Sequence, residues 1–300
     1  LMPLKSLDPI LERQSMVSQM IEREELATSL QAILKQVGDM ERVVSKAAVR
    51  RISPREVGFL KRALFLVTEF KTKLEQSTEA IPAWKHLASQ INPCSALLEK
   101  ISAELNDELP ALSNQGGMIR PGVDAELDRL HQISFSGKDY LLKINQAEIE
   151  RTGISSLKIS YNRVFGYYLE VTHVHKDKVP SDWIRKQTLT NAERYVTQEL
   201  KEYEEQILGA EEKINAIEFR IFNQLVETIV QYTTPLLLNA RLMGQADCLV
   251  SFAQVARDYK YCLPELNDGK AIVIRDGRHP VSERLMQADE KYVPHDHELN

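Results

Sequence analysis

The sequence predicts a mainly α-helical protein, α+β overall, in which two long antiparallel helices carry a small antiparallel β sheet at their far end. Apolar residues between 198 and 232 recur at alternating spacings of three and four, which is typical of a helix packed lengthwise against another helix. Residues 157–197 instead alternate between apolar and polar side chains, which predicts half-buried strands. The low counts of 12 Gly and 12 Pro, with 27% charged residues, also favour long solvated helices.

The helix predicted over 198–232 is the longest in the chain. Its apolar seam consists of Leu200, Tyr203, Ile207, Ala210, Ile214, Ile217 and Ile221. At 1.5 Å per residue such a helix is roughly 50 Å long and needs a partner along its length. We expect the helix at 124–151 to be that partner, because the β segment joins their far ends. Its apolar stripe consists of Leu127, Leu130, Ile133, Tyr140, Leu141, Ile144 and Ala147.

The β segment divides into a hairpin and two shorter strands. Alternation over 157–161 and 167–171 predicts two strands, and the break at 162–166 predicts the turn between them. Residues 187–189 and 194–196 suggest two shorter strands.

Capping patterns set other boundaries. Asp8-Pro9 and Ser53-Pro54-Arg55-Glu56 predict helix starts. A helix over 235–259 is expected to bury Leu237, Leu238, Leu242 and Leu249, and residues 271–274 predict a strand. The expected organisation is a helical core over 1–123, long helices at 124–153 and 198–232, an inserted β domain at 154–197, a helix returning to the core over 233–265, and an incomplete further unit at 266–300.

Composition limits the function. The net charge is −5, but residues 154–197 carry seven Lys and Arg against four Asp and Glu. A basic segment on an acidic chain indicates a local anionic partner rather than general nucleic-acid binding. The three cysteines are far apart and form no C-x-x-C pair, which favours a reducing cytosol. No apolar run approaches the roughly 20 residues of a membrane span, and the chain is interpreted as an excised fragment.

No catalytic group of residues is evident. The phosphate-loop pattern G-x-x-x-x-G-K-[ST] is absent, so we expect no enzyme activity from this segment. His173 and His175 fit polar residues at a strand end better than a metal site, because no third ligand is near in sequence. The basic segment instead offers the donors that bind phosphates, on Arg163 and over 185–191. Taken alone, a basic patch of this size more often serves solubility than DNA contact.

Four segments resemble the bacterial MutS family of DNA mismatch-recognition ATPases. They are QVGDMER at 36–42, YNRVFGYY at 161–168, KQTLTNAERY at 186–195 and DGRHPV at 276–281. The resemblance follows the family's order and covers essentially the whole chain. It implies a core and lever domain (domain III) with an inserted clamp (domain IV).

In the family, the clamps of a dimer close over double-stranded DNA and contact its backbone. By motif, the resemblance assigns DNA-backbone contacts to Asn162, Arg163, Arg185, Lys186, Gln187, Thr188 and Asn191. It assigns Tyr161, Tyr167 and Leu169 to the clamp's own core. The lever helices would transmit between DNA and the ATPase domain. The family's mismatch-reading and connector domains have no counterpart in these residues.

The resemblance also implies partners and cofactors of the full-length protein. Tyr292 and Val293 fall where family members hold the adenine ring, at the leading edge of an ATPase domain. ATP and Mg²⁺ would serve the full-length protein, with no cofactor or metal in this segment. Expected partners are duplex DNA, a second copy and a MutL-type protein, but no membrane, in a bacterial cytoplasm at the nucleoid. Two alternatives remain: a clamp-bearing relative acting in recombination, and a coiled-coil adaptor that binds no DNA.

Overall fold

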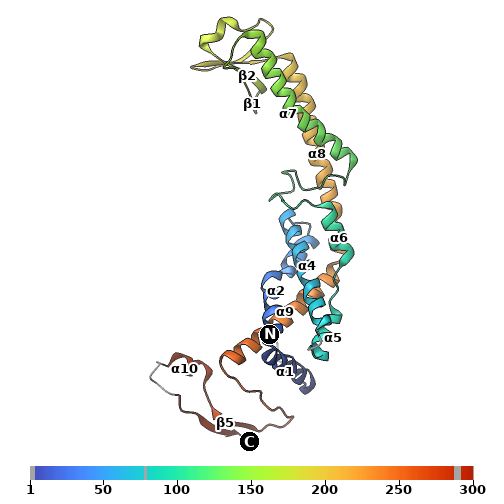
Figure 1. Cartoon of the computed structure of the whole chain (residues 1–300), viewed down its shortest axis with the longest axis vertical. Helices are drawn as coiled ribbons and strands as arrows, with labels where there is room; N and C mark the ends of the chain where they lie inside the picture. The colour runs from blue at the N-terminus through green and yellow to red at the C-terminus, as the bar shows by residue number, and fades with distance from the viewer. Residues whose placement is uncertain (1–3, 78–79, 287–291, 300) are drawn as a thin grey trace.

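The protein is an elongated, curved molecule with the four-stranded sheet at one end and a helical core further along (Figure 1). A computed structural model describes residues 4–77, 80–286 and 292–299. The helices of the core are α1 (Leu7–Glu22), α2 (Glu24–Val37), α3 (Met40–Ala48), α4 (Pro54–Gln76), α5 (Pro82–Gln90), α6 (Ser95–Glu104) and α9 (Thr233–Asp258). The long pair is α7 (Ala125–Thr152) and α8 (Gln198–Gln231). The mainly α fold with an inserted antiparallel sheet is therefore confirmed.

The helical core is a single apolar cluster that gathers residues from α1 to α9. Trp84 is fully buried, and its indole N–H donates to the carbonyl of Met16 at 3.1 Å. Asn239 on α9, also fully buried, accepts from the N–H of Asn92 and donates to the carbonyl of the same residue, at 3.0 and 2.6 Å. These paired bonds satisfy a buried amide and fix α9 against the α5–α6 connection.

The capping box predicted at the start of α4 is present. Ser53 accepts from the N–H of Glu56, and the Glu56 carboxylate accepts from the N–H of Ser53 at 3.0 Å. Lys46 on α3 also donates to Glu56 at 2.5 Å. Burial raises the pKa of the Glu56 carboxyl, but the bonds from Lys46 and Ser53 outweigh it and lower the pKa to about 2. One carboxylate thus caps α4 and ties it to α3.

The two long helices lie antiparallel, as expected, and α8 buries its predicted seam. Six of the seven seam residues are buried, and Ile217 is half-buried. The prediction for α7 is partly wrong. Leu127, Leu130 and Ile144 are buried, but Ile133 and Tyr140 are 38% and 44% exposed and Ala147 is exposed. The reason is that α7 meets an apolar core near each end and only α8 in between.

The sheet contains β1 (Lys158–Asn162), β2 (Gly166–Thr172), β3 (Ile184–Thr188) and β4 (Ala192–Val196). Its order is β1-β2-β4-β3, with every pair antiparallel. Its apolar core, separate from the helical one, consists of Ile144, Ile154, Leu157, Leu169, Val171, Trp183, Tyr195 and Leu200. Tyr161 was expected in this core, but it lies on edge strand β1 and is 49% exposed, with its ring against Tyr167.

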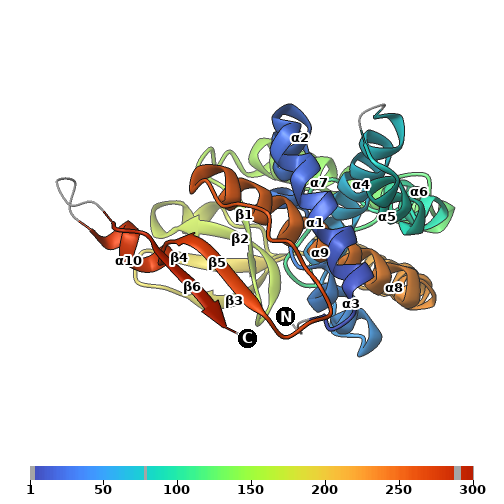
Figure 2. The ribbon, with the colours of Figure 1, turned by 90° about the horizontal axis from the view of Figure 1, so that it is seen from below.

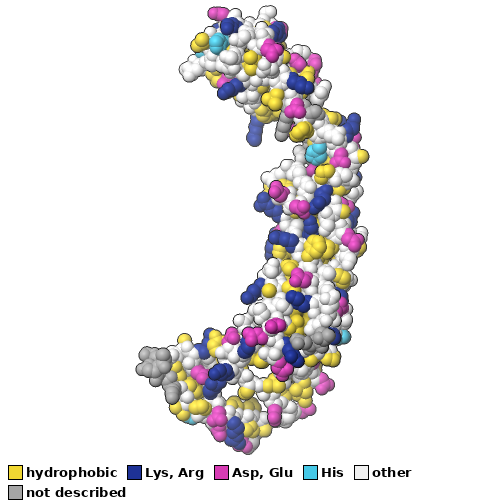
Figure 3. Space-filling view, viewed as in Figure 1, with side chains coloured by type: hydrophobic (Ala, Val, Ile, Leu, Met, Phe, Trp, Pro, Cys, Tyr) yellow, Lys and Arg dark blue, Asp and Glu magenta, His cyan; other side chains and the backbone are white. Residues whose placement is uncertain are grey.

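The last part of the chain forms a second small β unit beside the helices. Strands β5 (Ile272–Gly277) and β6 (His295–Leu299) pair antiparallel, with α10 (Pro280–Leu285) between them. Figure 2 shows this unit to one side of α1, α3 and α9. In the space-filling view, the end of the molecule that holds the four-stranded sheet in Figure 1 is linked to the rest by a narrower part (Figure 3).

Three smaller expectations need correction. α1 starts at Leu7, so Asp8 lies in the first turn and Ser6 takes the N-cap position. α9 starts at Thr233, two residues earlier than expected. Leu237 and Leu238 are 37% and 40% exposed, because Leu236 faces the core in their place. Leu242 and Leu249 are buried as predicted.

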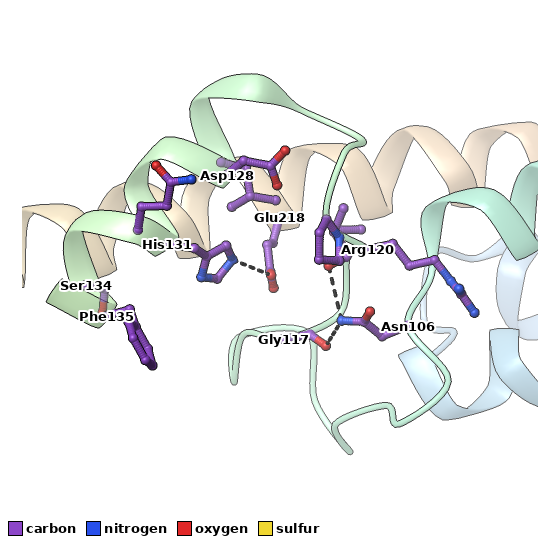
Figure 4. Close-up of a pocket in the computed structure, with 12 residues that line it drawn as sticks. Asn106, Gly117, Arg120, Asp128, His131, Ser134, Phe135 and Glu218 are labelled. Atoms are coloured by element: carbon purple, nitrogen blue, oxygen red, sulfur yellow. Dashed lines mark hydrogen bonds and ion pairs between the residues drawn. The ribbon is translucent and has the colours of Figure 1, made fainter. Parts of the chain in front are cut away.

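A buried carboxylate lies where the long helices leave the core (Figure 4). Glu218 on α8 is fully buried, and one of its oxygens accepts from the N–H of Met118 at 3.1 Å. Its other oxygen has no hydrogen-bond partner among the described residues and faces a cavity of about 990 Å³. His131 on α7 approaches that oxygen to 3.7 Å. Glu218 therefore joins α8 to the loop before α7, with half of its hydrogen-bonding capacity unused.

We predict that Glu56→Gln removes a pH-dependent part of the stability. The folded-state pKa of Glu56 is lowered, so its contribution is complete above the unfolded value of about 4.5 and is lost as the pH falls toward 2. Urea unfolding at pH 7 should show a loss of about 1–2 kcal/mol, and the difference from the parent should shrink at pH 3. Glu12→Gln, on the exposed face of α1, is the control; an equal loss at both pH values would contradict the prediction.

We also predict that two substitutions of Glu218 differ in their effect on the free energy of unfolding. Glu218→Ala leaves the Met118 N–H without its acceptor and enlarges the cavity, so it should lower the free energy of unfolding by about 2–4 kcal/mol. Glu218→Gln keeps an acceptor and removes a buried charge, so it should cost less than about 1 kcal/mol or stabilise the protein. Urea unfolding at pH 7 measures both. Equal damage from the two substitutions would show that the carboxylate charge itself is required.

Candidate nucleic-acid interface

The turn between β1 and β2 places Asn162 and Arg163 at one end of the sheet. The Asn162 side chain accepts from the N–H of Val164 at 2.8 Å, which closes the turn, while Arg163 is exposed. Gly166 ends the turn at φ +78°, and any side chain there would collide with the carboxylate of Glu204 on α8. The positive φ therefore favours glycine, and a side chain there would also displace the Glu204 carboxylate, which accepts from the N–H of Tyr167 at 3.3 Å and holds the turn against the long helix.

Edge strand β3 carries the next four predicted residues, 185–188. Its register against β4 shifts between Arg185 and Gln187, so Lys186 is the extra residue of a β-bulge. A bulge on an edge strand redirects a side chain, and Lys186 is exposed with no ion-pair partner in the described part of the chain. The side-chain oxygen of Gln187 accepts from Arg194 at 2.9 Å. Thr188 is exposed at the strand's end.

The turn after β3 lies at the opposite end of the sheet from Arg163. Asn191 is exposed, and its carbonyl accepts from the N–H of His173 at 3.2 Å. Gly166 begins β2 at the Arg163 end, whereas Thr172 pairs with Ala192 at the other end. The two turns are thus separated by the length of β2, about 20 Å. The structure brings residues 185–191 together along one edge and its turn, and separates them from Asn162 and Arg163.

Two clusters of charged side chains in the sheet were not predicted from the sequence. Arg194 lies over the ring of Tyr168 at 4.5 Å and pairs with Glu170 at 3.0 Å on one face. Glu193, which is 3% exposed, pairs with both Arg185 and Lys176. No local sequence signal reveals these pairs, because they depend on the strand register and on a residue from a different segment.

His173 and His175 do not lie on a strand. They belong to a 3₁₀ helix, His173–Lys178, and His173 Nε2 lies 3.0 Å from the carbonyl of Leu189. Within residues 4–77, 80–286 and 292–299, no group of three or more His, Cys, Asp or Glu side chains could hold a metal ion. Searched over the same residues, no helix is long and apolar enough to cross a membrane.

The predicted adenine-side residues lie just before β6. Tyr292 is half-buried and Val293 is 65% exposed, while residues 287–291 of the same motif lie outside the described residues. Apolar side chains of β5 are also open to solvent: Ile272 is 53% exposed and Val273 is 54% exposed. Successive side chains of a strand point to opposite faces, so β5 leaves apolar side chains open to solvent on both of its faces.

Comparison with known proteins identifies the sheet and its flanking helices. Residues 122–213 match the MutS family domain IV model. This range contains the whole sheet, all of α7 and nearly half of α8. The match therefore includes residues 154–197, the segment with the local excess of positive charge.

The chain is also similar to curated proteins named DNA mismatch repair protein MutS. It is 51% identical to that of Parabacteroides distasonis over 99% of the chain, 53% identical to that of Cytophaga hutchinsonii over 99%, and 48% identical to that of Flavobacterium psychrophilum over 98%. In each case the chain spans 34% of the relative's length. Over the third of these relatives that it spans, the chain belongs to the bacterial MutS family, and it contains that family's domain IV.

Proposed function

We propose that this chain is the lever and clamp of a MutS-type protein in DNA mismatch repair, and that its sheet holds duplex DNA by the backbone. The observation that carries the proposal is the domain IV match, which falls on a sheet held at the end of a long helix pair. The residues proposed to contact phosphates are Asn162, Arg163, Arg185, Lys186, Gln187, Thr188 and Asn191.

The charge distribution supports backbone contact rather than base reading. Arg163 and Lys186 are exposed and carry no ion pair among the described residues, so each is free to neutralise a phosphate. They lie on a turn and on an edge strand, and these residues present no helix to enter a major groove. Phosphate contacts position a protein on DNA without reading its sequence. Binding through this sheet alone should therefore be independent of sequence and of mismatches.

The helix pair would transmit changes between the sheet and the rest of the protein. α8 is continuous from the sheet into the helical core, and Thr197 caps it directly after β4 by accepting from the N–H of Leu200 at 3.1 Å. A rotation of the sheet must therefore move the N-terminal end of α8. The Glu218 oxygen that has no hydrogen-bond partner among the described residues lies where the helix pair meets the helical core.

The remaining parts of the proposal concern the longer protein. The apolar side chains exposed on both faces of β5 support the proposal that residues 266–300 begin an ATPase domain in which Tyr292 and Val293 hold adenine. ATP and Mg²⁺ would bind there together with residues outside this chain. A second copy and a MutL-type protein are the proposed protein partners, and the bacterial cytoplasm is the proposed location.

The mismatch-repair assignment is preferred to the two alternatives for specific reasons. The relatives compared above are named as mismatch repair proteins, which favours repair over recombination. A coiled-coil adaptor would need only the α8 seam. It would not need a sheet with an excess of positive charge at the end of the helix pair.

We predict weak, salt-dependent DNA binding by this chain. Contacts from Arg163, Arg185 and Lys186 should give a slope of log K against log salt near −3, at about −0.9 per phosphate. The dissociation constant at physiological salt should be roughly 10 µM or weaker, as for non-specific binding. Fluorescence anisotropy with matched and mismatched duplexes over a salt series measures both quantities.

The double substitution of Arg163→Glu with Lys186→Glu should flatten this slope and leave thermal stability nearly unchanged, because exposed charges contribute little to folding. Lys35→Glu with Arg62→Glu is the matched control, since it makes the same charge change at two exposed residues of the helical core that form no ion pair in the described part of the chain. Tight binding that ignores salt, or a clear preference for the mismatch, would contradict the clamp assignment.

We predict no ATP hydrolysis by the purified chain. Triphosphate binding in P-loop proteins depends on the loop and Mg²⁺, and the 300 residues contain no such loop. A phosphate-release assay with ATP and Mg²⁺ should give the rate of buffer alone. Steady hydrolysis that is lost on substitution of a residue in this chain, such as Tyr292→Ala, would overturn the expectation.

A further inference from the structure

A buried carboxylate lies directly beneath two of the basic side chains at the edge of the sheet. Glu193 on β4 is 3% exposed, on the sheet face that also carries Val171 and Tyr195. Its side chain accepts a hydrogen bond from the Tyr195 hydroxyl. A charge at this depth requires partners, because an unpaired buried carboxylate is strongly unfavourable.

The partners come from two different segments. Arg185 on β3 and Lys176 on the 3₁₀ helix each approach the same oxygen, Oε1, to 3.3 Å. Their charged groups are therefore no farther apart than twice that distance. Both side chains remain more than half exposed, at 56% and 54%. Two cations share one carboxylate, so the cluster keeps a surplus positive charge that faces solvent.

The bond from Tyr195, opposed by burial and reinforced by Lys176 and Arg185, lowers the pKa of the Glu193 carboxyl. Burial, together with the same contact with Glu193, raises the pKa of Tyr195 to about 12. Glu193 thus stays ionised and Tyr195 stays protonated at neutral pH. The cluster is therefore a fixed arrangement of charges around a buried anion.

We propose that Glu193 is a positioning residue that holds Lys176 and Arg185 together as a phosphate-binding pair for the DNA backbone, beside Lys186. This inference rests on the proposed DNA-binding function and adds Lys176, which no sequence motif marked, so the slope expected for the parent chain becomes steeper, from near −3 to about −3.6, at about −0.9 for each of four phosphate contacts. Long cationic side chains lose rotamer freedom when they bind a phosphate. Glu193 restricts them beforehand, so less freedom is lost on binding.

For Glu193→Gln, a simple effect of net charge and the proposed positioning role predict opposite changes in DNA affinity. Glu193→Gln removes a negative charge beside the proposed DNA site. If only net charge mattered, DNA would bind more tightly; if Glu193 positions the pair, DNA should bind about tenfold more weakly at 50 mM salt with the salt slope reduced by about one phosphate contact. Glu170→Gln is the matched control, because it makes the same charge change on the same sheet but pairs with Arg194. That control should bind as tightly as the parent or more so.

Further variants separate positioning from folding. Lys176→Gln and Arg185→Gln, both at exposed side chains, should each reduce the salt slope by about 0.9. Lys176→Gln should have a smaller effect in the Glu193→Gln background than alone, because the two act through one arrangement. Tryptophan fluorescence with Trp84→Phe in every variant reports the fold of the sheet, since the ring of the remaining Trp183 lies 5.7 Å from that of Tyr195. If Glu193→Gln changes this fluorescence, the DNA binding of Lys176→Gln and Arg185→Gln decides whether the pair contacts phosphate.

The outcomes for this inference and for the proposed function are distinct. If the parent chain binds no duplex DNA at any salt concentration, the proposed function fails. If the parent binds and the Arg163 and Lys186 substitutions weaken it, but Lys176→Gln has no effect and Glu193→Gln tightens binding as Glu170→Gln does, only the positioning role is refuted.

Discussion

The whole arrangement depends on the continuous apolar seam of α8, which is buried in two different cores. Leu200 belongs to the core of the sheet, whereas Ile214 and Leu225 belong to the helical core. The buried residues described form two separate clusters, and the α7–α8 pair runs from the sheet to the helical core (Figure 1). Most helical stability in proteins comes from packing of an apolar face, so the stability of the lever comes from α7 and the two cores. The position of the sheet consequently depends on how these two helices pack.

The long-range pattern could be predicted from the sequence because it follows from periodicity. The seam of α8, the hairpin of β1 and β2 and the capping box at Ser53 each depend on residues close in sequence, and the structure confirms all three. The stripe of α7 was predicted too broadly, since helical period alone does not show where a partner is present. The resemblance placed Tyr161 in the core of the sheet, but the strand order puts β1, and Tyr161 with it, on an edge.

The candidate interface was less predictable, because its geometry depends on register. The resemblance placed Asn162, Arg163 and five residues within 185–191 on the clamp surface, and the length of β2 separates the two turns of that surface. The bulge that frees Lys186 depends on how β3 meets β4. Lys176 joins Arg185 only because the 3₁₀ helix folds back over the same sheet. The role of each basic residue in DNA contact remains a prediction.

The number of basic residues in 154–197 overstates how many cations are free to bind a DNA phosphate. Of the seven basic residues in 154–197, Lys176, Arg185 and Arg194 already pair with carboxylates of the same sheet. Net charge governs the long-range attraction of DNA, which salt screens over roughly 10 Å. Contact depends instead on which cations can leave or share their partners. Arg194, paired with Glu170 and stacked on Tyr168, is used to hold the sheet together. Arg185 and Lys176 share a single buried oxygen and keep a surplus charge, so they can bind a phosphate without giving up Glu193.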